Sequence, residues 1–307
     1  MIAFVFSGGG NRGAVQAGAL LALLERNIRP DLIVGTSVGS LNGVPFASEP
    51  TLEGARLAVE TWKQVRRSDV FPGNPLTVGW RILTRQGSLH STDSFRRFVL
   101  SVLPSGVRRF GDLRVPCIIT ATVLRTGQLR LFGHDPNERL LDALLASTAI
   151  PPFFPAYRYR DDWLVDGAVL ANLPIGPAIA GGARTIYALN IADEEVPVNG
   201  RSLGQTLTYS LRAMLLQQDE RERRIVALGR QRGITIHDIR LTAGQRLAYN
   251  DFSSSAKLIA SGHQMATSYL DGLPSPRPNH YRRVALVVRS ALRSIGARGT
   301  PAAPPPA

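Results

Sequence analysis

The sequence predicts an α/β protein whose N-terminal strands are parallel. Two apolar segments of strand length, residues 2–6 and 32–35, flank a helical pattern over residues 14–25. This order is typical of a βαβ unit, in which the helix carries the chain back so that both strands run the same way. Apolar segments and helical patterns continue to alternate along the chain, so we expect one α/β domain followed by a tail.

The later elements follow from periodicity and from turn residues. Helical patterns cover residues 40–47, 52–68, 94–102, 140–146, 202–229 and 252–271. Strand patterns cover residues 116–124, 128–132, 163–165, 184–191 and 233–239. We expect the first two of these strands to form a hairpin, because Arg125-Thr126-Gly127 is a turn sequence.

Two helices carry explicit expectations about burial. In the helix over 52–68, Leu57, Val59 and Trp62 are expected to be buried. In the helix over 202–229, the predicted apolar face consists of Leu207, Leu211, Met214, Leu215, Ile225 and Leu228. Between the helices, residues 69–87 are rich in Gly and Pro, so we expect a loop that is either a lid or a structural crossing.

The composition is that of an ordinary globular protein and excludes several classes. The chain has 307 residues, 44% of them hydrophobic, and a formal net charge of +13. No apolar run reaches the ~18 residues of a membrane span, and no signal peptide is visible, so we expect a cytoplasmic protein. Basic and aromatic residues do not cluster as in a nucleic-acid-binding module. Without a cluster of metal ligands, and with Cys117 as the single cysteine, we predict no metal and no cofactor.

The most informative motif is Gly35-Thr36-Ser37-Val38-Gly39, which lies between an apolar strand and a segment of small residues. A G-x-S-x-G sequence at a strand-to-helix turn is a nucleophile elbow. The serine backbone is strained there, and side chains in place of Gly35 or Gly39 would collide with the neighbouring strand and helix. The following helix directs its N-terminal amides toward the serine oxygen. Ser37 is therefore the candidate nucleophile.

A second motif, a glycine loop, follows the first strand. Its residues are Gly8, Gly9, Gly10, Asn11, Arg12 and Gly13. The loop fits a dinucleotide fingerprint, but the acidic residue that would hold a ribose is missing, since Asp31 precedes the second strand instead of following it. Because adjacent parallel strands end at the same edge, the loop amides lie where an oxyanion would form beside Ser37. An oxyanion hole and a dinucleotide site both remain open at this point.

A serine nucleophile needs a base, and the sequence offers more than one. Asp166 stands at the end of a short strand directly before Gly167, and a partly desolvated carboxylate there would be a stronger base than usual. The order Ser…Asp…His also permits a triad of Ser37, Asp166 and either His237 or His263.

Three motifs taken together resemble the patatin-like phospholipase family. Gly8-Gly9-Gly10-Asn11-Arg12-Gly13, Gly35-Thr36-Ser37-Val38-Gly39 and Asp166-Gly167-Ala168 are similar to the family's G-G-G-x-[KR]-G, G-x-S-x-G and D-G-[AG], in the family's order. The resemblance covers roughly residues 1–190.

This resemblance implies a three-layer α/β/α sandwich around a mostly parallel sheet. It also implies a Ser37–Asp166 dyad that cleaves lipid esters, with the amides of Gly9, Gly10 and Asn11 holding the oxyanion and Arg12 nearby. It names neither the lipid nor the acyl position that is cleaved.

The C-terminal segment has a different composition. From Arg277 onward there are six arginines and no acidic residue. Read as a helix, residues 277–298 place apolar and basic residues on different faces, a pattern that suits anionic lipid headgroups. We therefore expect a hydrolase domain over residues 1–275, and a basic amphipathic segment with a Pro/Ala-rich tail over residues 276–307. Residues 277–298 are the candidate for peripheral membrane contact. The oligomeric state is left open.

Overall fold

The computed structural model describes residues 1–71, 92–192, 203–244 and 247–274. The chain divides into two units, Met1–Tyr269 and Leu270–Ala307. The first unit contains the sheet and the elements that cover it. The loop expected over residues 69–87 and the basic segment over 277–298 lie largely or wholly outside the described residues. The domain boundary expected after residue 275 stays a prediction.

The secondary structure follows the sequence closely. The strands are β1 (Ile2–Phe6), β2 (Leu32–Thr36), β3 (Cys117–Val123), β4 (Gln128–Phe132), β5 (Tyr157–Tyr159), β6 (Asp162–Asp166), β7 (Thr185–Ile191) and β8 (Thr235–Leu241). The α-helices are α1 (Ala14–Glu25), α2 (Val38–Ser48), α3 (Leu52–Gln64), α4 (Arg67–Val70), α6 (Thr92–Val102), α7 (Leu140–Ser147), α8 (Ile175–Ala180), α9 (Leu203–Gln231) and α10 (Ser255–Asp271). Short 3₁₀ helices are η1 (Gly10–Gly13), η2 (Phe110–Asp112) and η3 (Gly167–Val169). Only β5, which has three residues, had no counterpart among the expected strands.

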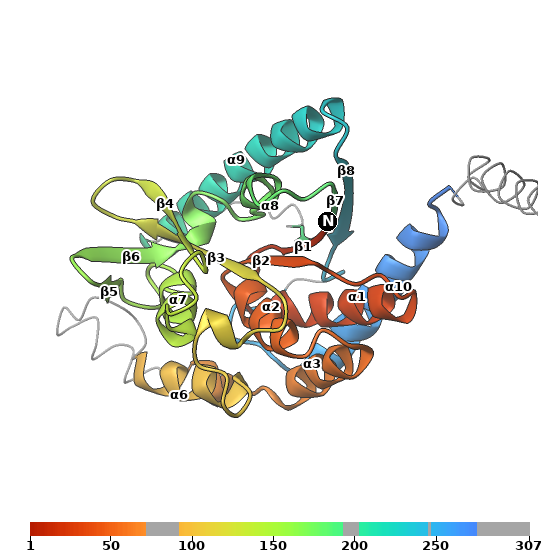
Figure 1. Ribbon diagram of the computed structural model, residues 1–307. Helices are drawn as coiled ribbons and strands as arrows, with labels where there is room; N and C mark the ends of the chain where they lie inside the picture. Colours follow the sequence, from red (N-terminus) through yellow and green to blue (C-terminus); the bar gives the residue numbers. More distant parts are fainter. Residues whose placement is uncertain (72–91, 193–202, 245–246, 275–307) are drawn as a thin grey trace, which may run out of the picture. The chain divides into compact units, whose positions relative to one another are not determined.

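These strands form one mixed sheet in the order β5-β6-β3-β2-β1-β7-β8, and β4 also pairs with β3 (Figure 1). The strands β3, β2, β1, β7 and β8 are parallel to one another, whereas β4, β5 and β6 run antiparallel to their partners. The expected hairpin of β3 and β4 is confirmed. The carboxyl ends of β1 and β2 lie next to each other, which brings the two glycine motifs to the same edge of the sheet.

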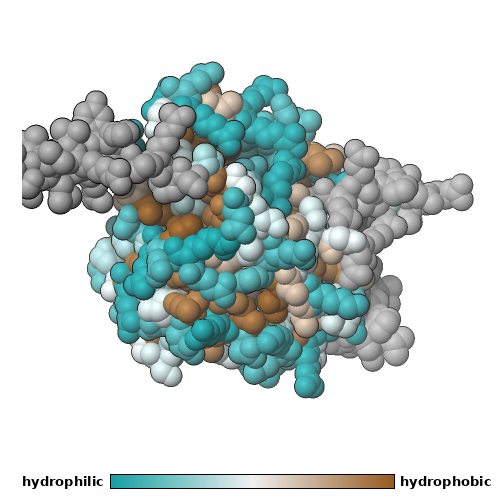
Figure 2. All heavy atoms as spheres, turned by 90° about the vertical axis from the view of Figure 1, so that its right-hand side faces the viewer, coloured by the Kyte–Doolittle hydropathy of each residue, from teal (hydrophilic) through white to brown (hydrophobic). Residues whose placement is uncertain are grey.

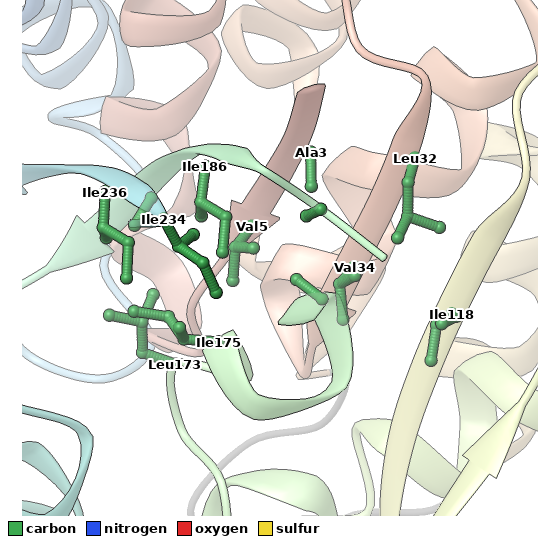
Figure 3. Packing of buried hydrophobic residues seen from close by; sticks show 13 residues of the cluster. Ala3, Val5, Leu32, Val34, Ile118, Leu173, Ile175, Ile186, Ile234 and Ile236 are labelled. Carbon is green, nitrogen blue, oxygen red and sulfur yellow. The ribbon is translucent and has the colours of Figure 1, made fainter. Parts of the chain in front are cut away.

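Helices cover both faces of the sheet, as expected for an α/β/α sandwich (Figure 1). One face carries a cluster of buried aliphatic side chains from five parallel strands and from the segment around α8, including Val5, Val34, Ile118, Ile186 and Ile236 (Figure 3). These residues alternate along their strands, because every second side chain points to the same face. The predicted fold class is confirmed.

The opposite face of the sheet is also covered by helices over β1 and β2. Phe4, Phe6 and Ile33 are completely buried there, and α1 and α2 pack onto this side. The side of the molecule shown in Figure 2 is largely hydrophilic, with apolar side chains exposed between polar ones. None of the described helices combines the length and the apolarity that crossing a bilayer requires.

Three burial expectations were wrong. Val59 and Trp62 are buried on α3, but Leu57 is 58% exposed. The buried side of α3 runs through Ala55, Val59 and Trp62, four and three residues apart, so Leu57 lies on the far side of the helix.

On α9, Met214 and Leu228 are 45% and 55% exposed. The buried side of this helix instead passes through Glu222 and Gly229, seven residues apart. Ile225, three residues from Glu222, packs against the aliphatic cluster as expected. Leu215 is partly buried, and the side chains of Leu207 and Leu211 lie outside the described residues.

Candidate active site

Ser37 occupies the sharp turn between β2 and α2. Its backbone angles, φ 55° and ψ −127°, are strained for a residue with a side chain. Three hydrogen bonds hold this conformation: the Ser37 amide donates to Ser147 Oγ at 2.9 Å, and the Ser37 carbonyl accepts from Ser40 N at 2.9 Å and Ser40 Oγ at 2.6 Å. These hydrogen bonds hold Ser37 in its strained backbone conformation.

Glycine is required at positions 35 and 39 because neighbouring backbone leaves no room for a side chain there. A Cβ at Gly35 would lie 2.8 Å from the Ser40 backbone, and one at Gly39 would lie 2.4 Å from the carbonyl oxygen of Phe6. Real Cβ atoms do not tolerate such distances. The collision expected from the sequence is confirmed at both positions.

The glycine loop lies directly beside Ser37. A Cβ at Gly8 would be 3.3 Å from the Cβ of Ser37. The Gly8 amide donates to the carbonyl of Asn172 at 3.0 Å, whereas the amides of Gly9, Gly10 and Asn11 donate no hydrogen bond within the described part of the chain. These three amides precede or begin the first turn of η1, where helix amides lack internal acceptors. They are therefore available to an external oxygen.

The polar side chains of the loop anchor it. Asn11 Nδ2 donates to the carbonyls of Ala248 at 2.8 Å and Asp251 at 2.6 Å. The Arg12 guanidinium contacts the carbonyls of Gly9 at 3.3 Å and Ala192 at 3.5 Å. Gly13 is packed so closely that an added Cβ would be 2.4 Å from Val38 Cγ2, next to the nucleophile. The loop is thus fixed on both of its sides.

Asp166 ends β6 and is completely buried. Its Oδ1 accepts from the amide of Ala168 at 2.8 Å, and its own amide donates to the carbonyl of Ala149 at 3.1 Å. Burial raises the pKa of the Asp166 carboxyl to about 7, against the smaller lowering effects of the Ser37 hydroxyl and the Ala168 amide. The environment has therefore tuned this carboxyl to a range in which it can exchange a proton at neutral pH.

Strand register places Ser37 and Asp166 at the same level. Thr36 pairs with Thr120 on β3, and the next β3 residue, Ala121, pairs with Asp166. Ser37 lowers the pKa of Asp166, yet Asp166 Oδ2 has no hydrogen-bond partner of ordinary geometry among the described residues. Ser37 is thus close enough to Asp166 to lower its pKa, although no hydrogen bond of ordinary geometry reaches Asp166 Oδ2.

The two candidate histidines lie elsewhere. His237 is level with Ile33 through β7 and β1, so three strand spacings separate it from β2. This amounts to roughly 14 Å, because neighbouring strands lie about 4.8 Å apart. His263 on α10 contacts Glu25 Oε2 at 2.7 Å, at the end of α1 farthest from the glycine loop. Neither histidine is in reach of Ser37, so the structure does not assemble the triad.

The dinucleotide alternative also lacks its acidic residue. Asp31 Oδ2 accepts from the amide of Ile2 at 2.7 Å, at the start of β1. It therefore lies at the edge of the sheet opposite the glycine loop. Within the described residues, no group of three or more His, Cys, Asp or Glu side chains is arranged to hold a metal ion.

Sequence reasoning missed the buried polar residues that support the site. Ser147 holds the Ser37 amide, and Thr36 Oγ1 lies 2.6 Å from Thr120 Oγ1 beneath the nucleophile. Gln16 Nε2 donates to the carbonyls of Ser7 and Leu189, and its Oε1 accepts from Asn42. The one available signal was the presence of small polar residues in otherwise apolar segments.

Comparisons with known proteins agree with this geometry. A family model described as Patatin-like phospholipase matches residues 4–179, more than half of the chain. The chain is 29% identical over 195 residues to patatin-like phospholipase domain-containing protein 7 of Rattus norvegicus, which covers 63% of this chain and 14% of that protein. It is 28% identical over 214 residues to lysophospholipase NTE1 of Mycosarcoma maydis, which covers 67% of this chain and 10% of that protein.

The chain thus matches only a small part of these curated relatives. Among solved structures, VipD from Legionella pneumophila is similar over 88% of this chain and 66% of that chain, with 15% identity and a TM-score of 0.49. This structural similarity is too low to carry an argument about function.

Proposed function

The chain belongs to the patatin-like phospholipase family, and from this membership we propose that it is a serine acyl hydrolase acting on carboxylic esters of lipids. Ser37 is the nucleophile and Asp166 is its base. The observation that carries the proposal is the fully buried Asp166 carboxyl, with a pKa of about 7, level with a serine in a strained elbow. A structural carboxyl would be expected to be paired or exposed, whereas this one is buried, and its Oδ2 accepts no hydrogen bond from the part of the chain that the structure describes.

In the first half of the reaction, Ser37 Oγ attacks the ester carbonyl carbon while Asp166 takes the hydroxyl proton. The carbonyl oxygen becomes an oxyanion and accepts hydrogen bonds from the amides of Gly9, Gly10 and Asn11. When the tetrahedral intermediate collapses, the bond to the alcohol breaks and Asp166 returns its proton to the leaving oxygen. The products are the free alcohol and an acyl ester on Ser37.

In the second half, water attacks the acyl ester and Asp166 takes its proton. A second oxyanion forms in the same glycine loop and collapses, and the proton passes to Ser37 as the fatty acid leaves. One base serves both halves because it is neutral after each attack and ionised after each collapse.

The lipid class follows from relatives and not from geometry. One relative carries the name lysophospholipase, and the family is named for phospholipase activity. We extend this to phospholipids, lysophospholipids or simpler lipid esters as substrates. Peripheral membrane contact through residues 277–298 belongs to the same proposal and rests on the arginine-rich sequence alone.

The test is hydrolysis of a soluble chromogenic ester by single variants. Ser37→Ala is expected to lower kcat at least about 10³-fold, since little beyond binding and oxyanion stabilisation remains without a nucleophile. Asp166→Asn is expected to do the same, while His263→Ala serves as the control and retains activity. Loss of activity in His237→Ala or His263→Ala would instead support a histidine-dependent mechanism, and full activity in Ser37→Ala would disprove the proposal.

A further inference from the structure

An aromatic cluster lies beside the candidate active site and is not accounted for by the dyad or the glycine loop. It includes Trp62, Phe71, Phe153, Phe154, Tyr249 and Phe252, which come from four separate parts of the chain. The ring of Phe95 on α6 stacks on Phe154, with centroids 4.6 Å apart. Ring centroids lie 4.5 Å apart for Phe153 and Tyr249, 5.3 Å for Phe71 and Tyr249, and 5.5 Å for Phe71 and Phe154. Phe252 links the cluster to Trp62 at 6.5 Å.

One end of the cluster lies close to the residue after the nucleophile. A Cβ added at Gly13 would lie 2.6 Å from Trp62 Cζ2 and 2.4 Å from Val38 Cγ2. The side chains of Trp62 and Val38 therefore pack around Gly13, in the glycine loop.

Tyr249 and Phe153 belong to segments of the chain that are anchored on opposite sides of the site. Asn11, in the glycine loop after β1, binds the carbonyls of Ala248 and Asp251, which flank Tyr249. On the other side, the Asp166 amide binds the carbonyl of Ala149, four residues before Phe153.

The order of the strands places Ser37 between the anchoring points of these two segments. β2 lies between β1, which carries the glycine loop, and β3, which pairs with β6. The contact between Phe153 and Tyr249 therefore joins a segment anchored on the oxyanion side of the site to a segment anchored on the base side.

These two rings also keep surface to offer to a ligand. Tyr249 is 43% exposed and Phe153 is partly exposed, whereas Phe154 and Phe71 behind them are buried. Aromatic rings in this position provide a flat apolar surface that ordinary core packing does not require.

We propose that Phe153 and Tyr249 form a wall of the subsite that binds the acyl chain of the ester. This inference rests on the proposed hydrolysis through Ser37. An acyl chain attached to the reacting carbonyl would leave Ser37 between the glycine loop and Asp166, and the two rings belong to segments anchored on these two sides. Each methylene removed from water against the rings favours binding, so the wall selects esters of longer acyl chains.

The test compares 4-nitrophenyl esters of two-carbon and twelve-carbon acids. The measured quantity is the ratio of kcat/KM for the long ester to that for the short ester. Phe153→Ala and Tyr249→Ala are each expected to lower this ratio roughly tenfold, because truncating a large apolar contact commonly costs about that factor. Tyr249→Phe is expected to keep the ratio within about twofold, because the ring and not the hydroxyl contacts the chain.

Two further variants test whether a lower ratio results from general damage to the fold. Leu57→Ala removes an exposed apolar side chain on α3 outside the cluster and should leave the ratio unchanged. Phe153→Leu, a milder change than Phe153→Ala, tests the wall if the alanine variant fails to fold, and it should lower the ratio by a smaller factor.

The outcomes separate this inference from the proposed function. If the unaltered chain hydrolyses both esters and the ratio does not change in the Phe153 and Tyr249 variants, the wall is disproved while the hydrolase stands. If the unaltered chain hydrolyses neither ester, both proposals fail. A ratio that falls in these variants and not in Leu57→Ala supports the wall.

Discussion

At the scale of single residues, the site depends on a carboxyl group that is kept out of water. Asp166 has to be ionised to accept a proton, yet complete burial favours its neutral form and raises its pKa to about 7. As a result, the Asp166 carboxyl is about half ionised near neutral pH. A model carboxylate with a pKa near 3.9 would be ionised more fully but would accept a proton from serine far less readily.

This balance predicts a pH dependence of catalysis. Because only ionised Asp166 can take the serine proton, kcat/KM should rise about tenfold per pH unit below pH 7 and level off above it. The measurement is hydrolysis of a soluble ester between pH 5 and 9. Glu222→Gln is the control, because burial raises the pKa of this second carboxyl to about 8 on α9, apart from the dyad. A profile that is flat down to pH 5, or that changes in Glu222→Gln, would contradict the assignment.

The same burial predicts a cost to stability. The folded-state pKa of Asp166 is raised from 3.8 to about 7, so the folded chain binds more protons than the unfolded chain between these values. The free energy of unfolding therefore falls as the pH rises through this window and stays lowered above it. Asp166→Asn carries no charge and should be more stable than the unaltered chain at pH 8, by about 1–4 kcal/mol at about 1.36 kcal/mol per pKa unit.

Urea unfolding of both proteins at several pH values measures this difference. The advantage of Asp166→Asn should shrink as the pH is lowered toward 4, where the native carboxyl is neutral as well. An advantage that stays constant with pH would show that the asparagine acts through packing and not through the charge of the carboxylate.

Ser147 allows a test of how the nucleophile is positioned. Its hydroxyl is fully buried and accepts the Ser37 amide at 2.9 Å. Ser147→Ala leaves that amide without its acceptor, so the elbow relaxes and kcat should fall roughly 10–100-fold with little change in KM. Thr148→Ala is the matched control, because Thr148 is also buried but donates to the Leu144 carbonyl within its own helix. If kcat is retained in Ser147→Ala and only stability falls, the serine is merely structural.

At the scale of elements, the strands and helices that position the site were predictable from the sequence. The βαβ unit placed both glycine motifs at a common edge, because the strand–helix–strand order predicts parallel strands before any packing is known. What could not be predicted depends on contacts distant in sequence. Ser147 lies 110 residues from Ser37, and nothing near it indicates its partner. Likewise, Leu57 looked like a core residue until the packing of α3 showed which of its sides is buried.

Close packing around the elbow predicts that alanine substitution has opposite effects on stability at two helical glycines. Gly39→Ala would place a Cβ 2.4 Å from the Phe6 carbonyl, so α2 has to move away from β1. Overpacking of this kind costs about 1–3 kcal/mol, and activity should fall with it because Ser37 begins this helix. Gly176→Ala in α8 has no atom within 4 Å of the added Cβ, so it should stabilise by about 0.4–1 kcal/mol. Thermal unfolding measures the stability of both variants, and ester hydrolysis measures their activity. If Gly39→Ala and Gly176→Ala change stability and activity alike, the predicted collision at Gly39 is refuted.

At the scale of the whole molecule, the charge and the site raise one question, which is how the proposed hydrolase would meet an insoluble lipid ester. The formal net charge is +13, and six arginines without an acidic residue lie from Arg277 onward. Ser37 and Asp166 belong to the first unit of the chain, whereas these arginines belong to the second. Hydrolysis of a soluble ester and attachment to a lipid surface should therefore respond to different substitutions.

The last prediction separates these two activities. Replacing Arg282, Arg289 and Arg293 by Gln removes three charges, each worth about 1 kcal/mol near an anionic surface, so binding should weaken by roughly two orders of magnitude. Flotation with vesicles containing anionic lipid at physiological salt measures binding, and neutral vesicles are the control. Hydrolysis of a soluble ester should be unchanged, because the residues of the proposed site all belong to the first unit of the chain. If the triple variant floats as well as the unaltered chain, the arginines do not hold the protein at membranes. If it loses soluble-ester activity, the segment contributes to the fold of the hydrolase instead.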